Sequence, residues 1–389
     1  MRWWIIFGMC FLICQYVIAN NKTIPVVVVT DLYHPYQDPG DNIDLINGYF
    51  LPNVELKAIL LDCHASFRKD VSKGAGSGTF VDKAGPREPG IISVQQLNYI
   101  FKKSVPFGIG PFSKLTTLDD KMENISGFEQ SAVDLLYEVL LNSSEKVNVL
   151  SFGSQRILAV AYNRFPKLMK KKIKMIHVSA GTSNNNLDFL EWNVGLDVKA
   201  FVRLIRSDLP IALYPCAAGK LLLEDKDKFN AFAKDDGNTY FEMKNLSYFS
   251  RFDSRIQQYI KYVFERRNTI DYLSILEIPH VNDNAMFDRN LHMWEFPLWM
   301  QLLDLNLVRQ RDGQYALKFS MDLLKSDYVI EQKLVPAKLN VLDSGHFESI
   351  ITNSSSNKYI YIRSETNEFE IGMNEALPLF LEKYLREIN

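Results

Sequence analysis

A short acidic segment near the amino terminus carries the residue types that bind hard cations. It reads Asp31-Leu-Tyr-His-Pro-Tyr-Gln-Asp38-Pro-Gly-Asp41-Asn42-Ile-Asp44 and directly follows an apolar, β-branched run. An aspartate at the end of a buried strand, with a turn and further carboxylates behind it, brings several oxygen atoms around one point, so we expect a divalent cation here. Two alternatives remain open: Asp41 or Asn42 could cap a helix, and Asp38-Pro-Gly could form only a turn.

A second polar segment, Glu191-Trp-Asn193-Val-Gly-Leu-Asp197-Val-Lys-Ala200, follows another apolar run at 173–179. Its carboxylates and its amide can accept or donate hydrogen bonds to a polar ligand. Asp197 stands where a helix is expected to begin, so helix capping is an alternative to a ligand role for this residue.

The elements that must position these segments are visible in the first 215 residues, where apolar runs alternate with amphipathic segments of helical length. We expect strands at 24–30, 55–61, 105–110, 147–152, 173–179 and 210–214, and helices at 42–50, 93–102, 129–141, 156–164 and 198–206. This alternation predicts an α/β fold, a mostly parallel open sheet with helices on both faces. Ligands of such sheets bind beyond the carboxyl ends of the strands. The residues expected at that edge are Asp31, Asp62, Cys63, His64, Gly153, Gly181 and Cys216.

The pattern changes after about residue 217. We expect helices at 255–267 and 296–305, a β-hairpin that pairs 358–363 with 369–371, and a closing helix at 374–388. The residue types at 353–357 predict a turn. A glycine-rich loop at 72–90 is long enough to act as a lid beside the strand ends.

Three regions of the chain together resemble the nucleoside hydrolases, the calcium-dependent N-ribohydrolases that include inosine-uridine preferring enzymes. That family has an Asp-Pro-Gly-X-Asp-Asp motif after its first strand, a Gly-Pro-Leu-Thr-Asn-type turn after a middle strand, and a Glu-Phe-Asn segment that runs into Asp-Pro-Glu-Ala-Ala. The similar regions here are 31–44, 149–159 and 191–200, in the same order and at similar spacing. The resemblance covers about residues 24–215 and implies a nucleoside hydrolase-like fold.

The resemblance assigns roles to the first acidic segment. Asp31 stands where the family has a metal-binding aspartate that also acts as the base for the attacking water, and Asp38 competes for that role because it precedes Pro-Gly. Asp41 then matches an aspartate that binds ribose hydroxyls. Asn42 falls at a metal-chelating position, where an amide keeps the oxygen but removes a charge, and Arg156 falls where the family binds metal through a backbone carbonyl.

The same resemblance assigns residues farther along the chain. Glu191 and Asn193 match ribose-binding positions. The late His-Asp pair of the family, which contacts the leaving group and completes the calcium site, is replaced here by His292 and Glu295 as the nearest candidates. A glutamate at the start of a helix could instead be favoured only by the helix dipole, and that alternative stays open for Glu295.

The implied activity is hydrolysis of the N-glycosidic bond of a ribonucleoside or related glycoside by a calcium-bound water. Two rivals follow from the departures just described: a sugar- or nucleoside-binding protein without turnover, and a hydrolase of a different glycoside. Asp343-Ser-Gly-His346 suggests a hydrolase triad, but no Gly-X-Ser-X-Gly elbow surrounds the serine, so we interpret this match as chance.

Composition and termini limit the possible partners. A net charge of -2, from 44 basic and 46 acidic residues, argues against a protein that binds nucleic acid by neutralising phosphates. We expect a small-molecule partner and allow a homo-oligomer.

Arg2 and the apolar run 3–18, with Ala19 before Asn20, predict a signal peptide at 1–19 and export to the periplasm or outside the cell, with no membrane contact once it is removed. An uncleaved anchor is the alternative, although about 16 apolar residues are short for a span.

The mature chain would be one nucleoside hydrolase-like domain at 20–389, with a core at 24–310 and an extension at 311–389. It would keep two of the four cysteines, Cys63 and Cys216, which either pair or stay reduced.

Overall fold

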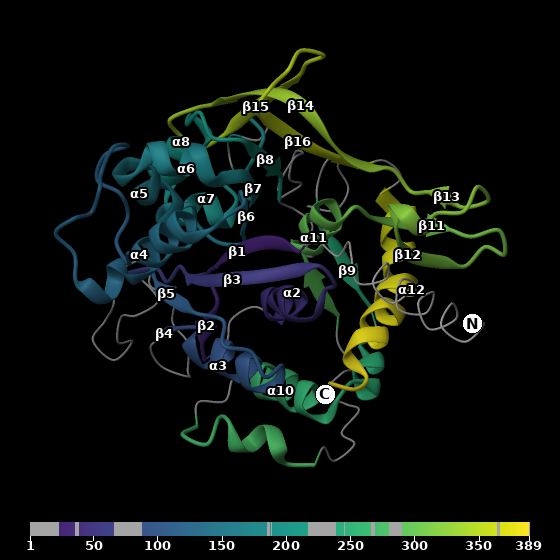
Figure 1. The fold of residues 1–389 in the computed structure, drawn as a ribbon. Coiled ribbons are helices and arrows are strands. Elements are labelled where there is room, and N and C mark those ends of the chain that lie inside the picture. Colours follow the sequence, from purple (N-terminus) through teal and green to yellow (C-terminus); the bar gives the residue numbers. More distant parts are fainter. Residues whose placement is uncertain are drawn as a thin grey trace, which may run out of the picture.

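A nine-stranded sheet runs through the part of the chain that the structure describes (Figure 1). The structure is a computed structural model, and it describes residues 23–35, 39–65, 88–184, 187, 189–216, 239–244, 246–265, 269–279, 290–363 and 366–388. The strands are β1 (Ile24–Thr30), β3 (Val54–Leu61), β5 (Phe107–Ile109), β6 (Val147–Ser151), β7 (Ile173–Ser179), β8 (Ile211–Tyr214), β14 (Gln332–Val341), β15 (Phe347–Ile351) and β16 (Lys358–Arg363). Their order is β15-β14-β16-β8-β7-β6-β1-β3-β5, and the run from β16 to β5 is parallel. The predicted mostly parallel sheet is confirmed, with strand ends shifted by at most two residues.

Both faces of the central, parallel strands are buried, and successive side chains of each strand point to opposite faces. In β1, Val26 and Val28 pack into one apolar cluster, while Val27 and Val29 pack into another. The helices on the first face are α2 (Pro39–Phe50), α3 (Ile91–Ile100), α10 (Ser254–Phe264), α11 (Phe296–Leu303) and α12 (Thr366–Leu385). The helices on the second face are α4 (Gly127–Asn142), α5 (Arg156–Arg164), α6 (Pro166–Lys172) and α8 (Val198–Ile205). The predicted helices on both faces are therefore confirmed.

The carboxyl-terminal region differs from the prediction. The expected hairpin between 358–363 and 369–371 is wrong, because 369–371 lies inside α12. The buried residues Phe369, Met373, Leu377 and Phe380 recur every three or four positions, which is the period of a helix and not of a strand. The hairpin of this region is instead β14–β15, and β14 also pairs antiparallel with β16. The turn predicted at 353–357 does connect two strands, β15 and β16.

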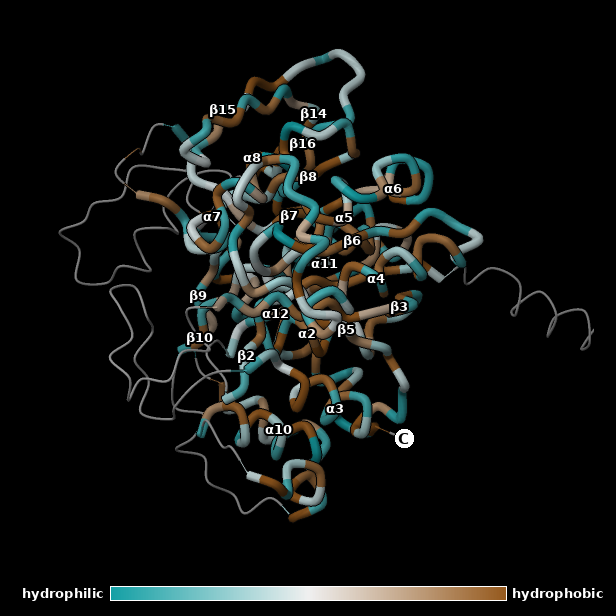
Figure 2. Tube along the Cα trace, turned by 90° about the vertical axis from the view of Figure 1, so that its left-hand side faces the viewer, coloured by the Kyte–Doolittle hydropathy of each residue, from teal (hydrophilic) through white to brown (hydrophobic). Residues whose placement is uncertain are grey.

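Shorter elements surround the carboxyl edge of the sheet. They are β2 (Tyr33–His34) paired with β4 (Glu88–Pro89), β9 (Phe241–Met243) paired with β10 (Leu291–Met293), and α7 (Trp192–Leu196). Figure 2 shows β2, β9, β10 and α7 along one side of the molecule. A separate sheet joins β11 (Leu305–Arg309), β12 (Tyr315–Phe319) and β13 (Tyr328–Val329).

Several predictions concern residues outside the described part of the chain. These are the signal peptide at 1–19, Asp38, and most of the glycine-rich loop at 72–90. Of the helices that the structure does describe, none combines the length and the apolar character needed to cross a bilayer.

Candidate active site at the carboxyl edge of the sheet

The residues predicted to follow the strands do gather at one edge. Backbone hydrogen bonds continue past the ends of the central strands: Asp62 N–H donates to the Thr30 carbonyl at 2.8 Å, and Ala180 N–H donates to the Tyr214 carbonyl at 3.1 Å. Gly153 allows β6 to approach β1 here, because a Cβ at this position would lie 2.9 Å from the Cβ of Asp31. This edge is therefore where the candidate site residues meet.

Glu191 is held by the backbone around it. One carboxylate oxygen accepts from Asn193 N–H at 2.7 Å, and the other accepts from Gly181 N–H at 3.0 Å and Val194 N–H at 3.2 Å. Its own N–H donates to Thr182 Oγ1 at 2.7 Å. Burial raises the pKa of Glu191, and the three N–H donors oppose that effect by stabilising the charged form. Glu191 is also the N-cap of α7, which fixes its position at the end of β7.

Ser179, the last residue of β7, connects two candidate residues that are far apart in sequence. Its carbonyl accepts from Asn193 Nδ2 at 3.0 Å, and its hydroxyl donates to Glu295 Oε1 at 3.0 Å. Glu295 precedes α11, but its side chain makes no capping hydrogen bond there. The structure therefore brings Glu191, Asn193 and Glu295 to the same strand end. Ser179 was not among the residues predicted for the site. Its position at the end of the predicted strand 173–179 is the only feature of the sequence that could have indicated it.

Cys216 lies in the same cluster. Its Sγ is 3.4 Å from the Ser179 hydroxyl, and burial, followed by the nearby carboxylates of Glu191 and Glu295, raises the pKa of the thiol. Cys63 and Cys216 are both buried and are not bonded to each other. The two cysteines therefore do not form a disulfide with each other.

Arg156 forms a buried ion pair with Asp62, the residue that follows β3. Its Nη2 donates to Asp62 Oδ1 at 2.6 Å, its Nη1 lies 3.9 Å from Asp197 Oδ2, and all three side chains are essentially without solvent exposure. The neighbouring Asp62 and Asp197 outweigh burial and raise the pKa of Arg156. Sequence analysis placed Arg156 at a metal-binding position through its carbonyl. That role stays a prediction, and the structure adds that the positive guanidinium is buried against Asp62 and Asp197.

Asp197 caps a helix, as the alternative interpretation held. One carboxylate oxygen accepts from Ala200 N–H at 3.1 Å at the start of α8, and the other accepts from Leu115 N–H at 2.8 Å. Burial nevertheless raises its pKa. Asp197 therefore holds α8 and the segment after β5 together beneath the site.

Asp41 and Asn42 lie inside α2, which begins at Pro39, so neither residue caps this helix. Both side chains are buried. The Asn42 Oδ1 accepts from the Tyr259 hydroxyl at 2.6 Å, which is a neutral hydrogen bond to α10. Whether Asn42 ligates a cation stays a prediction.

His292 lies in β10 and contacts an aromatic residue. Its Nδ1 is 2.7 Å from the Tyr240 hydroxyl, and the two rings are stacked with centroids 5.7 Å apart. Both Nη atoms of Arg363, at the end of β16, donate to the Tyr240 carbonyl at 3.1 Å. His292 is thus tied to the end of β16.

The donor chemistry of the first acidic segment suits calcium, because Asp31 and Asp41 offer carboxylate oxygens that are only 7% exposed as residues. Within the described residues, however, no three His, Cys, Asp or Glu side chains are grouped in a way that could hold a metal ion. Asp38 lies outside these residues. A calcium site formed by this segment stays a prediction.

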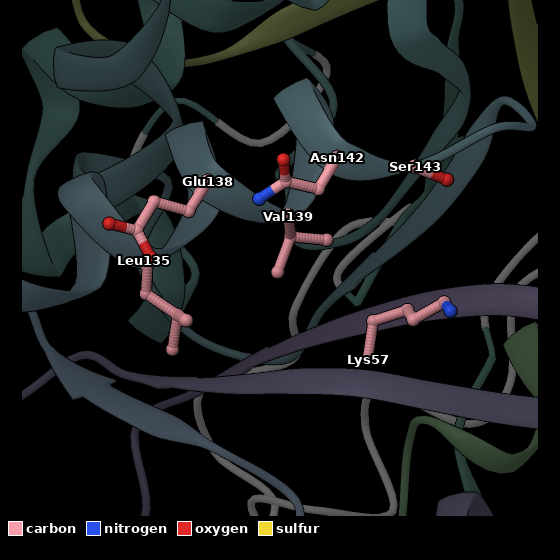
Figure 3. Close-up of a pocket in the computed structure, with 6 residues that line it drawn as sticks. All are labelled: Lys57, Leu135, Glu138, Val139, Asn142 and Ser143. Carbon is pink, nitrogen blue, oxygen red and sulfur yellow. The ribbon is translucent and has the colours of Figure 1, made fainter.

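A hollow on the surface lies elsewhere. It is lined by side chains of α4 and by Lys57 of β3 (Figure 3). Glu138 is its acidic side chain, and it contains none of the candidate residues.

Comparisons with known proteins agree with this arrangement at the level of the fold. No protein-family model matches the chain, and no curated protein matches it by sequence. Among solved structures, the purine-preferring ribonucleoside hydrolase from Gardnerella vaginalis aligns with a TM-score of 0.50 and 11% identity, over 92% of this chain and 99% of that one. An inosine-guanosine nucleoside hydrolase aligns at 0.48 and 13% identity over 93% and 99% of the two chains. The inosine-uridine preferring nucleoside hydrolase from Bacillus anthracis aligns at 0.45 and 13% identity over 93% and 100%.

At 11% identity, the similarity to the Gardnerella vaginalis enzyme concerns the fold alone. It extends over nearly all of both chains, as is expected if the two chains share one fold. The chain therefore has a divergent nucleoside hydrolase-like fold.

Proposed function

We propose that this protein hydrolyses the N-glycosidic bond of a ribonucleoside or related glycoside at the carboxyl edge of its sheet. The observation that carries the proposal is the buried group of Glu191, Asn193 and Glu295 around Ser179. Two of these residues come from the segment that resembles the ribose-binding segment of the family, and the third comes from the segment proposed to replace its late aspartate.

Glu191 and Asn193 would bind the sugar hydroxyls. A carboxylate has about four sites for accepting hydrogen bonds, and three backbone N–H groups already hold Glu191 rigidly in place. One hydroxyl can therefore be received without reorienting the side chain. Asn193 donates through Nδ2 to the Ser179 carbonyl, which fixes its amide and directs its oxygen as an acceptor for a second hydroxyl.

Asp31 would take a proton from the attacking water. The water oxygen bonds to C1 of the sugar, the bond from C1 to the base nitrogen breaks, and the base leaves with that electron pair and gains a proton. The ring carries positive charge in the transition state, and the buried carboxylates around it stabilise that charge.

We further propose that one calcium ion takes part, held by Asp31 and Asp38 together with Asn42, Glu295 and the backbone carbonyl of Arg156, while Asp41 binds a ribose hydroxyl. When bound, calcium would supply Lewis-acid polarisation of a water and of the sugar diol. The support for this step is the oxygen chemistry of the donors and the burial of Asp31, Asn42 and Glu295.

The experiment that tests the proposal measures hydrolysis of inosine, guanosine, adenosine, uridine and cytidine, with calcium and after chelation. Asp31→Asn and Glu191→Gln should each reduce kcat/KM by at least about a hundredfold, because general base catalysis and transition-state contacts contribute on that order. Glu138→Gln, at the surface hollow, removes the same charge and should leave kcat/KM unchanged. Equal loss in Glu138→Gln, or no turnover of any nucleoside, would contradict the proposal.

Glu295→Gln tests the leaving-group side. The change preserves size and removes charge, while its amide oxygen can still accept from the Ser179 hydroxyl. If Glu295 completes the cation site, calorimetry should show weaker calcium binding together with reduced turnover and an unchanged apo fold. Unchanged affinity and activity would assign Glu295 a structural role.

A binding protein without turnover is the second candidate. It is favoured by one observation: the oxygen of Asn42 is engaged with the neutral Tyr259 hydroxyl at 2.6 Å, at a position where the resemblance calls for a charged ligand. Nucleoside binding by calorimetry without hydrolysis in any calcium concentration would select this candidate over the first.

A further inference from the structure

The β14–β15 hairpin contacts the segment that carries Glu191. Phe347 N–H donates to the Thr182 carbonyl at 3.0 Å, and Asn184 N–H donates to the Phe347 carbonyl at 2.7 Å. These bonds form a short parallel bridge between Ser183 and Phe347. Thr182 also receives the Glu191 N–H through its hydroxyl. Residues near the end of the chain thus reach Glu191 through one intermediate residue.

His346 makes a second connection from the same hairpin. Its Nε2 lies 2.9 Å from the Phe189 carbonyl, two residues before Glu191. A carbonyl can only accept, so this nitrogen carries the proton, and Nδ1 accepts from the Ser344 hydroxyl at 2.9 Å. The ring is buried and both nitrogens are engaged. In a catalytic triad, the His346 nitrogen that does not contact the serine would bond to a carboxylate, but here Nε2 bonds to the Phe189 carbonyl. We therefore call residues 343–346 a structural clip, a turn that holds another segment of the chain in place.

Packing around the clip is close. Gly345 has φ +89°, and a Cβ on it would lie 2.6 Å from Val194 Cγ1. Gly181 has φ +119°, and a Cβ there would lie 3.0 Å from the Phe347 ring. Each glycine thus lets the hairpin lie directly against residues that flank Glu191 and Asn193.

We propose that His346 is a positioning residue for Glu191 and Asn193. It bonds to the backbone at Phe189, two residues before Glu191, while its neighbour Phe347 bonds to the backbone at Thr182. Thr182 directly follows Gly181, whose N–H donates to the Glu191 carboxylate. The effect of His346 on activity rests on the proposed function, in which Glu191 binds the ligand. The effect of His346 on the position of Glu191 can be measured without a ligand.

Three variants test the proposal. His346→Leu removes the donor to Phe189, whereas His346→Gln offers an amide that can replace it. Asp343→Asn is the matched control in the same turn, because it removes only an exposed ion pair with Arg206. The first measurement is amide hydrogen exchange at Gly181, Asn193 and Val194, whose N–H groups donate to the Glu191 carboxylate.

In His346→Leu we expect about tenfold faster exchange at these three amides, equivalent to ~1.4 kcal/mol of local opening free energy. His346→Gln should stay within about threefold of the wild type, and Asp343→Asn should not differ. Exchange in β3 should remain unchanged in all three. If the three amides of His346→Leu exchange at the wild-type rate, the proposal is overturned. It is also overturned if the amides of β3 exchange faster as well, because that would indicate a general loss of stability.

The second measurement is the KM for inosine, which should rise about tenfold in His346→Leu and recover in His346→Gln. If the wild type neither binds nor hydrolyses inosine or the other nucleosides, the proposed function fails while the exchange experiment still decides the positioning role. If inosine is hydrolysed and its KM does not change in His346→Leu, His346 has no positioning effect on the ligand and this proposal is overturned.

Discussion

The buried pair of Arg156 and Asp62 should make Asp62→Asn one of the most damaging conservative changes in the chain. Both side chains have no solvent exposure, and their closest atoms are 2.6 Å apart. With an effective dielectric constant of about 20, the gross attraction at this distance is about 6 kcal/mol, against about 4 kcal/mol for the 3.9 Å contact of Arg156 with Asp197. The variant removes the larger attraction and leaves the guanidinium buried with only the weaker one.

Removing one partner of such a pair typically costs ~3–5 kcal/mol, because the remaining charge stays out of water without compensation. We expect that cost for Asp62→Asn in the free energy of unfolding, measured by urea titration at pH 7 with the slope checked for two-state behaviour. The exposed pair of Glu331 with Lys333 supplies the control, and Glu331→Gln should cost less than about 1 kcal/mol.

The double variant Asp62→Leu with Arg156→Met sharpens the test. Asp62 Oδ2 and two guanidinium nitrogens of Arg156 have no hydrogen-bond partner among the described residues, so the pair is incompletely satisfied. Replacing both partners by apolar side chains should therefore cost much less than the sum of the two single changes. If Asp62→Asn costs no more than Glu331→Gln, or the double variant is simply additive, the interpretation of this pair as a coupled buried charge is wrong.

Three further predictions concern pH, packing and processing. Burial lowers the pKa of His177 to about 3, so the folded state resists a proton that the unfolded state binds near its ordinary value. The contribution of neutral His177 to the free energy of unfolding is therefore complete above about pH 6.5 and is lost as the pH falls toward 3. In urea titrations, His177→Gln should reduce the dependence of the unfolding free energy on pH by up to about 1.4 kcal/mol per pH unit in this range. Equal pH dependence in the variant and the wild type would refute this prediction. Gly108→Ala should destabilise the protein by ~1–3 kcal/mol in the same assay, because a Cβ would lie 2.6 Å from the Ala132 backbone, and an unchanged midpoint would contradict this close packing. After export, mass spectrometry should find a mature chain that begins at Asn20, and a secreted protein that still begins at Met1 would rule out cleavage.

Sequence patterns predicted the parallel part of the sheet because its strands are buried on both faces. The β1 segment is apolar up to its last residue, Thr30, so the strand and the position of Asp31 directly after it can both be recognised from the sequence. Glu191 and Asn193 lie 12 and 14 positions after the end of β7, and they were identified from the resemblance of their segment to the nucleoside hydrolases.

The carboxyl-terminal strands were less visible because they are only half-buried. In β15, the four residues after Phe347 are exposed, and in β12 every residue is of intermediate exposure, so neither strand has the continuous apolar run on which the prediction relied. The 369–371 segment was mistaken for a strand because three residues are too few to reveal a helical period. The contacts of Arg156 with Asp62 and of Ser179 with Glu295 join residues 94 and 116 positions apart, and no local pattern specifies such pairs.

The bond from His346 to Phe189 spans 157 positions of the chain, which has a consequence for the order in which the protein is made. At a synthesis rate of about 5–20 residues per second, the Glu191 segment leaves the ribosome about 8–30 s before the residues that clip it. During that interval β1, β3, β6 and β7 can already pair with one another, whereas the bonds from Phe347 and His346 cannot form. The backbone bonds that hold the Glu191 segment are thus formed late, after the β14–β15 hairpin has been translated.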